Sequence, residues 1–207
     1  RIVRSATNGH LSDEKGQVTP LWADTLIELA KNEVGLVITG HFCVDKMQRA
    51  DAGQPVLDEA TDESLLRRAC DGVHRYGGKL FFQLSHSGIK GVESVNGAPP
   101  KHPEDFTREE LDRLVEQFAF AAKKCKESGA DGVQVSGIDF NRRAGQKTPF
   151  YLDALICEPD FAAKLKSGAQ DGSKCLACNG CYTIYRKRFV RCVQHQDEIE
   201  QFKTIPW

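Results

Sequence analysis

The stretch Lys79-Leu80-Phe81-Phe82-Gln83-Leu84-Ser85-His86-Ser87-Gly88 does most to decide the fold of this chain. Its first six residues form a short, mostly apolar run that follows the helix-breaking pair Gly77-Gly78. Runs of this kind are typical of strands buried in parallel sheets. Gln83 and the residues after it therefore stand at the carboxyl end of a strand, where (β/α) proteins form their ligand sites.

The same pattern recurs on both sides of this stretch. Gly35-Leu36-Val37-Ile38-Thr39-Gly40 is a second apolar run bounded by glycine. Apolar residues at helical spacing separate the runs, and Thr107 with Glu110 forms the Thr-x-x-Glu capping box of a helix start. We predict strands at 1–7, 35–40, 79–84 and 131–136, and helices at 20–30, 62–76 and 107–128. Strands that alternate with helices through short links are the signature of parallel βα units.

The expected helices are amphipathic, so their apolar faces predict part of the core. Trp22 lies on the apolar face of the first helix and is predicted to be a core residue. In the helix at 107–128 we expect the following residues to be buried: Leu111, Leu114, Val115, Phe118 and Ala122.

The alternation fails after Ser136. Residues 137–151 are polar and rich in Gly, Arg and Lys, and only a short helix is expected at 159–165. The end of the chain is a Cys-rich segment followed by a basic and then an acidic stretch. We therefore expect an α/β unit over 1–168 that is incomplete after about residue 136, and a Cys-rich C-terminal tail over 169–207.

The charge balance narrows the classes of partner. The chain has 207 residues with 28 Lys plus Arg and 29 Asp plus Glu, so its formal net charge is −1. This balance predicts no attraction to nucleic acid, and no apolar run approaches the ~20 residues that span a bilayer. The chain starts at Arg1 rather than Met, which suggests a natural N-terminus elsewhere, and no signal peptide is visible.

The eight cysteines fall into two groups. Four are scattered among apolar and helical segments, and four form the cluster C-x2-C-x2-C-x10-C, which consists of Cys175, Cys178, Cys181 and Cys192. This distribution favours a reducing, cytoplasmic environment over a secreted disulfide scaffold. Thiolates at such short spacing can converge on one ion. An iron–sulfur cluster, a zinc ion and the absence of any metal remain open.

Several segments, in order, resemble one enzyme family. The carrying motifs are Arg-Ile-Val-Arg-Ser-Ala-Thr-Asn (1–8), Gly-Leu-Val-Ile-Thr-Gly-His (35–41), Gln-Leu-Ser-His-Ser-Gly (83–88), Ala-x-x-x-Lys-x-x-Gly-Ala-Asp-Gly-Val-Gln (122–134) and the segments 156–161 and 174–181. Together they are similar to the old yellow enzyme family, in its NADH:flavin oxidoreductase and 2,4-dienoyl-CoA-reductase-like branch.

The resemblance implies a parallel (β/α) barrel of TIM type, here partial, with FMN at the carboxyl ends of the strands. By motif position, the residues implied to bind FMN are Ser5, Ala6, Thr7, Asn8, Gly40, His41 and Gln83. Gln83 would bond to the pyrimidine edge of the flavin ring. His86 also follows a strand end, and we expect it to be a structural residue that bonds to backbone. In the dienoyl-CoA-reductase-like branch, a similar Cys set holds a [4Fe–4S] cluster.

The implied function is FMN-dependent oxidoreduction. NADH or NADPH would supply a hydride that passes to an activated alkene, such as an enone or enoyl thioester, as the small-molecule substrate. Catalytic residues are not identified, because Val135-Ser136-Gly137 stands where the family carries its carbonyl-orienting His pair. Two alternatives remain: a non-catalytic barrel fragment, and a small iron–sulfur or other metal-binding electron-transfer protein. Apolar edges left by an incomplete barrel predict a homo-oligomer.

Overall fold

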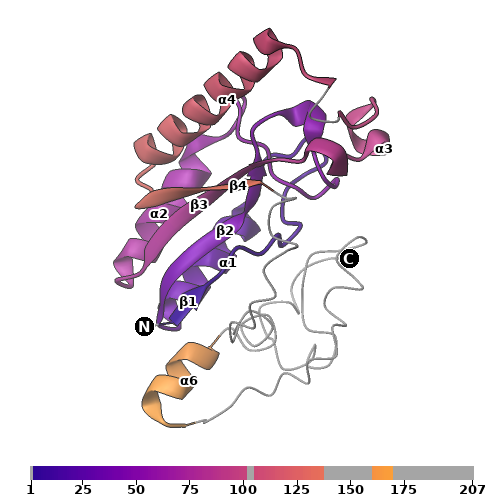
Figure 1. The fold of residues 1–207 in the computed structure, drawn as a ribbon. Coiled ribbons are helices and arrows are strands. Elements are labelled where there is room, and N and C mark those ends of the chain that lie inside the picture. Colours follow the sequence, from indigo (N-terminus) through magenta and orange to yellow (C-terminus); the bar gives the residue numbers. More distant parts are fainter. Residues whose placement is uncertain (1, 102–104, 138–159, 170–207) are drawn as a thin grey trace.

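The computed structural model describes residues 2–101, 105–137 and 160–169 (Figure 1). Its elements, in chain order, are β1 (Ile2–Arg4), α1 (Pro20–Lys31), β2 (Val34–Cys43), η1 (Lys46–Gln48), α2 (Glu63–Arg75), β3 (Lys79–His86), η2 (Gly88–Lys90), α3 (Glu93–Asn96), α4 (Arg108–Glu127), β4 (Gly132–Gly137) and α6 (Phe161–Ser167). The predicted alternation of strands and helices is confirmed over the first 137 residues.

The helices begin where the sequence carries capping residues. The hydroxyl of Thr19 accepts a hydrogen bond from the Trp22 N–H, and Pro20 follows as the first residue of α1. The carboxylate of Asp62 caps α2 in the same manner. At α4 both halves of the predicted capping box are present, since Thr107 and Glu110 bond to each other's backbone N–H.

The strands form one parallel sheet in the order β1-β2-β3-β4. In Figure 1 the helices α1, α2 and α4 lie on one side of this sheet. The strand side chains that face the helices alternate with those on the opposite face. Val37, Leu80 and Leu84 are fully buried on the helix-covered face, so the core lies between the sheet and these helices.

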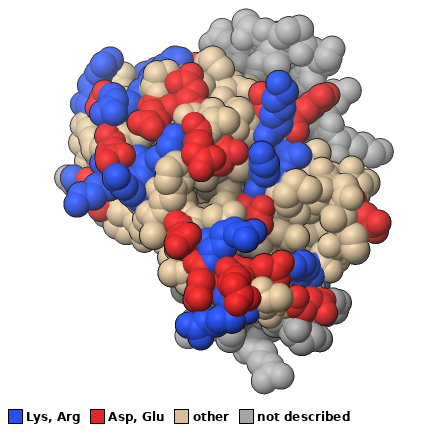
Figure 2. Space-filling view, turned by 90° about the horizontal axis from the view of Figure 1, so that it is seen from above, with Lys and Arg blue, Asp and Glu red and all other residues tan. Residues whose placement is uncertain are grey.

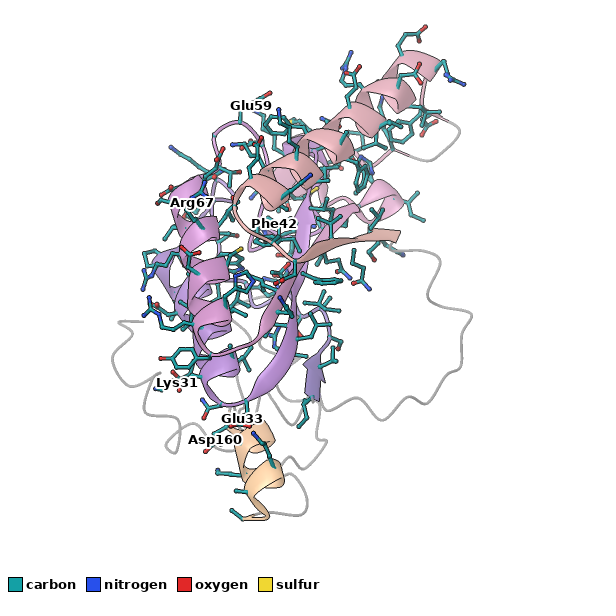
Figure 3. The ribbon with its side chains drawn as sticks, turned by 90° about the vertical axis from the view of Figure 1, so that its left-hand side faces the viewer. Lys31, Glu33, Phe42, Glu59, Arg67 and Asp160 are labelled. Carbon is teal, nitrogen blue, oxygen red and sulfur yellow. The ribbon has the colours of Figure 1, made fainter. Side chains whose placement is uncertain are left out.

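Three aromatic rings form the centre of this core. Trp22 from α1, Phe42 from β2 and Phe82 from β3 have ring centroids 5.5 to 6.0 Å apart. The Trp22–Phe42 pair packs edge to face, an arrangement that aromatic rings prefer. Figure 3 shows Phe42 inside the molecule, between the sheet and the helices. The core position predicted for Trp22 is therefore confirmed.

Predictions about local structure are wrong at three places. The strands β2 and β3 continue to Cys43 and His86, past the ends expected at 40 and 84, so residues expected after the strand ends lie within strands. The first strand ends at Arg4, not at residue 7, because the chain then turns to contact a loop that follows β2. On α4, Leu111 and Val115 were expected to be buried but are 44% and 67% exposed. The buried stripe of α4 passes instead through Ala121 and Cys125, which join the core, and the stripe with Leu111 and Val115 lies beside it, turned toward solvent.

The short helix α6 lies beside the turn between α1 and β2. Lys166 of α6 forms an ion pair with Glu33 in that turn. Figure 3 shows Lys31, Glu33 and Asp160 gathered where α6 approaches the turn. Within the described residues, no helix has both the length and the apolar character to cross a membrane.

Candidate functional site

A row of polar side chains crosses the middle of the sheet on the face away from the helices. His41 of β2 is in register with Gln83 of β3, which is in register with Gln134 of β4. Their neighbours Phe42 and Leu84 point into the helix-covered core, so strand alternation places the row on the other face. The Gln83 Nε2 donates to the Gln134 Oε1 at 2.8 Å. Gln83 is thus part of an amide pair.

The segment after β1 lies directly on Gly40. A Cβ at Gly40 would stand 2.7 Å from the Thr7 carbonyl oxygen and 2.8 Å from the Asn8 Cα. Only glycine permits so close an approach of two backbones. The β2–β3 register also shifts between Ile38 and His41, around this glycine. Thr7, Asn8 and Gly40, all predicted as site residues, are therefore brought together, with Ser5 accepting a hydrogen bond from the Thr7 hydroxyl.

A loop far along the chain holds the end of β1 in place. The carboxylate of Asp51 accepts a hydrogen bond from Asn8 Nδ2 at 3.0 Å and forms a 3.0 Å contact with His10 Nδ1. His10 has a left-handed backbone, with φ of 53°, and a Cβ on Gly53 would lie 2.4 Å from its ring. Burial would raise the pKa of Asp51, but the bond from His10 and further donors outweigh it and lower that pKa.

A second buried network surrounds His41. The amide of Gln54 is fully buried and places its Nε2 2.8 Å from His41 Nδ1. The Ser85 hydroxyl, also fully buried, lies 3.1 Å from the same nitrogen. Burial lowers the pKa of His41, an effect that the charge of Asp51 opposes and that of His10 supports. His41 is therefore held mainly as a neutral ring.

His86 has the structural role expected of it. Its Nδ1 accepts a hydrogen bond from the Gly88 backbone N–H at 3.1 Å, and its ring packs edge to face on Phe106. The nearby Cys43 thiol donates to the carbonyl oxygens of Asp45 and Gln48. Burial raises the pKa of this thiol to about 12, so Cys43 is an inert core residue.

The sequence interpretation missed several residues of the site. Gln134 could have been found, because alternation along residues 132–137 places it beside Gln83. The loop residues His10, Asp51 and Gln54 had no local signal. Ser85 lies in β3, and its motif was recognised without a role for its hydroxyl. The predicted metal ligands Cys175, Cys178, Cys181 and Cys192 lie outside the described residues. Within the described ranges, no group of three or more His, Cys, Asp and Glu side chains could hold a metal ion.

The face of the molecule shown in Figure 2 carries charges of both signs. On the face shown in Figure 2, Lys and Arg alternate with Asp and Glu, and uncharged areas lie between them. Such interspersed charge favours neither a polyanion nor a polycation as ligand. This face therefore offers no site based on charge to set beside the polar row and the two loop networks.

The fold and these contacts define a class of protein. The chain is a parallel (β/α) protein with a row of polar side chains on the face of its sheet that lies away from the helices. Sequence comparison then identifies the family. The profile of the NADH:flavin oxidoreductase / NADH oxidase family matches residues 1–139, which is more than half of the chain. The chain belongs to this family.

Individual relatives agree with this assignment. The chain is 28% identical over 151 residues to an NADH oxidase of Thermoanaerobacter brockii, covering 66% of this chain and 23% of that protein. It is 27% identical over 148 residues to a cinnamate reductase of Clostridium sporogenes, covering 63% of this chain and 22% of that protein. An old yellow enzyme homologue from Zymomonas mobilis shares the fold, with a TM-score of 0.58, 21% identity, and coverage of 65% and 43%. The chain thus spans less than half the length of each.

Proposed function

We propose that this chain forms part of an FMN-dependent oxidoreductase that passes a hydride from NADH or NADPH to an activated alkene. The observation that supports it best is the polar row at His41, Gln83 and Gln134, beside the close contact at Gly40, in a chain of the NADH:flavin oxidoreductase family. The cinnamate reductase among its relatives, named for an alkene acid, favours an alkene substrate.

The residues of the row suit the ring of FMN. The pyrimidine edge of a flavin alternates carbonyl oxygens with an N–H group, and an amide side chain offers both a donor and an acceptor. After the bond between them, Gln83 keeps its Oε1 and Gln134 keeps its Nε2 for such an edge. The backbone of Thr7 and Asn8 lies against Gly40. Together with Ser5 and Ala6, which precede it, this segment would support the ring from the β1 side. When bound, FMN supplies the hydride-transfer chemistry.

The wider architecture is also a proposal. We infer that β1 to β4 correspond to the first four strands of a (β/α) barrel of TIM type, which is partial in this chain and forms a unit over 1–168 that is incomplete after about residue 136. The uncovered flank with Val115 of α4 and Val135 of β4 is where a further βα unit would pack, and we propose that a second copy of the chain covers it. Three free, buried cysteines, Cys43, Cys70 and Cys125, support a reducing, cytoplasmic setting.

A titration with FMN tests the proposed function. We expect added FMN to lose its fluorescence on binding, and we expect Gln83→Ala to weaken binding roughly tenfold, which corresponds to the loss of about 1.4 kcal/mol from one hydrogen bond. Gln117→Ala is the matched control, because Gln117 lies on α4 in the helix layer. A chain that leaves the fluorescence of FMN unchanged at every concentration would exclude the proposal.

The cysteine cluster supports a second candidate, electron transfer through a bound metal centre. Its spacing, C-x2-C-x2-C-x10-C, is compatible with [4Fe–4S] or zinc. We propose to measure iron, zinc and sulfide in protein purified without air, together with Cys178→Ala. Metal that is present in the wild type and absent from the variant would support the candidate. Protein without metal would exclude it, and FMN binding would remain a separate result.

A further inference from the structure

The buried amide of Gln54 has only one reasonable orientation. Its Oε1 lies 2.6 Å from the backbone N–H of Ala50, which can only donate. The Ser87 hydroxyl can donate to the same oxygen at 3.5 Å. The oxygen end of the amide is therefore fixed by a backbone group, and the Nε2 end must point the other way, toward β2.

This orientation decides which nitrogen of His41 carries the proton. Gln54 Nε2 can only donate, and it reaches His41 Nδ1 at 2.8 Å and the His41 carbonyl oxygen at 3.2 Å. His41 Nδ1 must therefore accept, which leaves the proton of the neutral ring on Nε2. The Ser85 hydroxyl fits the same assignment. It accepts from Gln54 Nε2 at 3.3 Å and has both His41 Nδ1 and the Phe42 carbonyl oxygen as acceptors.

The groups around His41 keep this ring neutral. Gln54 is fully buried, and it and Ser85 are uncharged partners from the loop after β2 and from β3. The charged groups that face it are Asp51, which would favour a cation, and His10, which opposes one. Asp51 itself contacts His10 and accepts a hydrogen bond from Asn8.

The remaining donor of His41 belongs to the candidate site. Nδ1 is occupied, so Nε2–H is the single donor that the ring can offer to a ligand, and no described residue accepts from it. His41 stands in the row with Gln83 and Gln134. We propose that Gln54 is a positioning residue that holds His41 as a neutral Nε2–H donor, and that this N–H binds a carbonyl oxygen of the ligand. The ligand's identity, as a flavin or an alkene with an activating carbonyl, rests on the proposed function.

Nitrogen NMR of the histidine rings tests the positioning role without any cofactor. In protein labelled with ¹⁵N histidine, we expect His41 to show the Nε2–H tautomer. His86 is an internal reference, because its Nδ1 accepts from a backbone N–H and should report the same tautomer in every variant. Wild-type His41 protonated on Nδ1 would overturn the proposal at once.

Two substitutions separate a positioning role from simple packing. Gln54→Glu places a carboxylate beside His41 Nδ1, so we expect the proton to move to Nδ1 and the pKa of His41 to rise. Gln54→Met fills a similar volume without a donor, so we expect a mixture of tautomers. If both variants keep the wild-type tautomer, Gln54 has no positioning role. Should Gln54→Glu fail to fold, the wild type and Gln54→Met decide the outcome, with the His86 signals as the check on folding.

The proposed bond from His41 to a ligand carbonyl is tested by adding FMN and then 2-cyclohexenone to the same sample. A change of the His41 Nε2–H signal with FMN alone would identify a flavin carbonyl as the acceptor. A change that needs 2-cyclohexenone as well would identify the substrate carbonyl. Bound FMN with no change in either step would overturn this half. His41→Phe should then weaken binding of that ligand roughly tenfold, and His41→Gln, which keeps a donor, should weaken it less. If FMN does not bind at all, the proposed function fails. The tautomer of His41 still tests the positioning role of Gln54 in that case.

Discussion

The strand ends of β1 to β3 and the flank formed by β4 and α4 are built from similar local patterns but have opposite surroundings. At the strand ends, Asn8, His41 and Ser85 each have a partner from a distant segment. On the flank, Val115 and Val135 are 67% and 68% exposed. Both regions alternate apolar and polar residues as helices and strands should. The difference shows that burial depends on which element packs next to a segment, and the segment's own pattern does not decide it.

The largest expected difference between the regions is in folding stability. Phe82→Ala removes a fully buried ring that packs on Trp22 and Phe42, so we expect a loss of about 3–5 kcal/mol in the free energy of unfolding. Val135→Ala, on the exposed flank, should change it by less than about 0.5 kcal/mol. Urea denaturation followed by circular dichroism measures both. Equal losses for the two variants would show that the flank is as well covered as the core.

The amino end of β4, which borders the flank, should give an intermediate, pH-dependent effect. Asp131, before β4, accepts hydrogen bonds from Lys79 and His74 at 2.7 Å and from the Leu80 N–H at 2.9 Å. Burial would raise the pKa of Asp131, but these bonds outweigh it and lower that pKa. A carboxylate with a lowered pKa stabilises the fold above its unfolded value of about 4, and the stabilisation is lost as pH falls through the folded value.

We therefore expect Asp131→Asn to destabilise the protein by about 1.5 kcal/mol at pH 7, a figure that allows for the partial exposure of these groups. The difference from the wild type should shrink steadily below about pH 4. Urea titrations at several pH values measure it, with Glu59→Gln on an exposed loop as the control. A difference that is constant down to pH 2 would contradict the role given to the ionised carboxylate.

A smaller effect is expected at the start of α4. Thr107→Ala removes the hydroxyl that caps this helix, and we expect a loss of about 1 kcal/mol. Thr107→Ser keeps the hydroxyl and should stay within a few tenths of the wild type. Hydrogen exchange in the first turn of α4 should rise in the alanine variant alone. If both variants lose stability equally, the methyl group, and not the cap, is responsible.

The smallest change in stability is expected on the flank itself. Val115→Lys should alter the free energy of unfolding by less than about 0.5 kcal/mol, because the side chain is already exposed. Its effect should appear in self-association, since a charge in an apolar contact opposes pairing of two copies. Sedimentation velocity at several concentrations compares it with Glu116→Lys, which adds a lysine at the neighbouring exposed position. A wild type that is monomeric throughout would remove the proposed self-contact.

The sequence predicted the elements better than the site. The apolar runs at 35–40 and 79–84 and the capping box at Thr107 identify β2, β3 and α4, because these signals are local. Gly40 and Gln83 were predicted from the family motifs, and the close contact at Gly40 gives a physical reason for a glycine at that position.

The features that the sequence did not predict depend on contacts between distant segments. Gln54 comes 13 residues after His41 in a loop without periodic pattern, and nothing local marks it as a partner of that ring. The exposure of Leu111 and Val115 could not be predicted either, because the apolar residues of α4 cover a wide side of the helix and only the neighbouring elements decide which of them are buried. Both failures have the same cause, since a sequence pattern does not show which distant segment will pack against a given residue.

The contact of His10 with Gly53 has a consequence for protein engineering. The ring leaves no room for a side chain at Gly53, and Asp51 holds that ring from the same loop. Chimeras with other family members that exchange only one of these two segments would combine parts that do not match. Crossover points should therefore be placed so that residues 8–10 and 51–54 are inherited from the same parent.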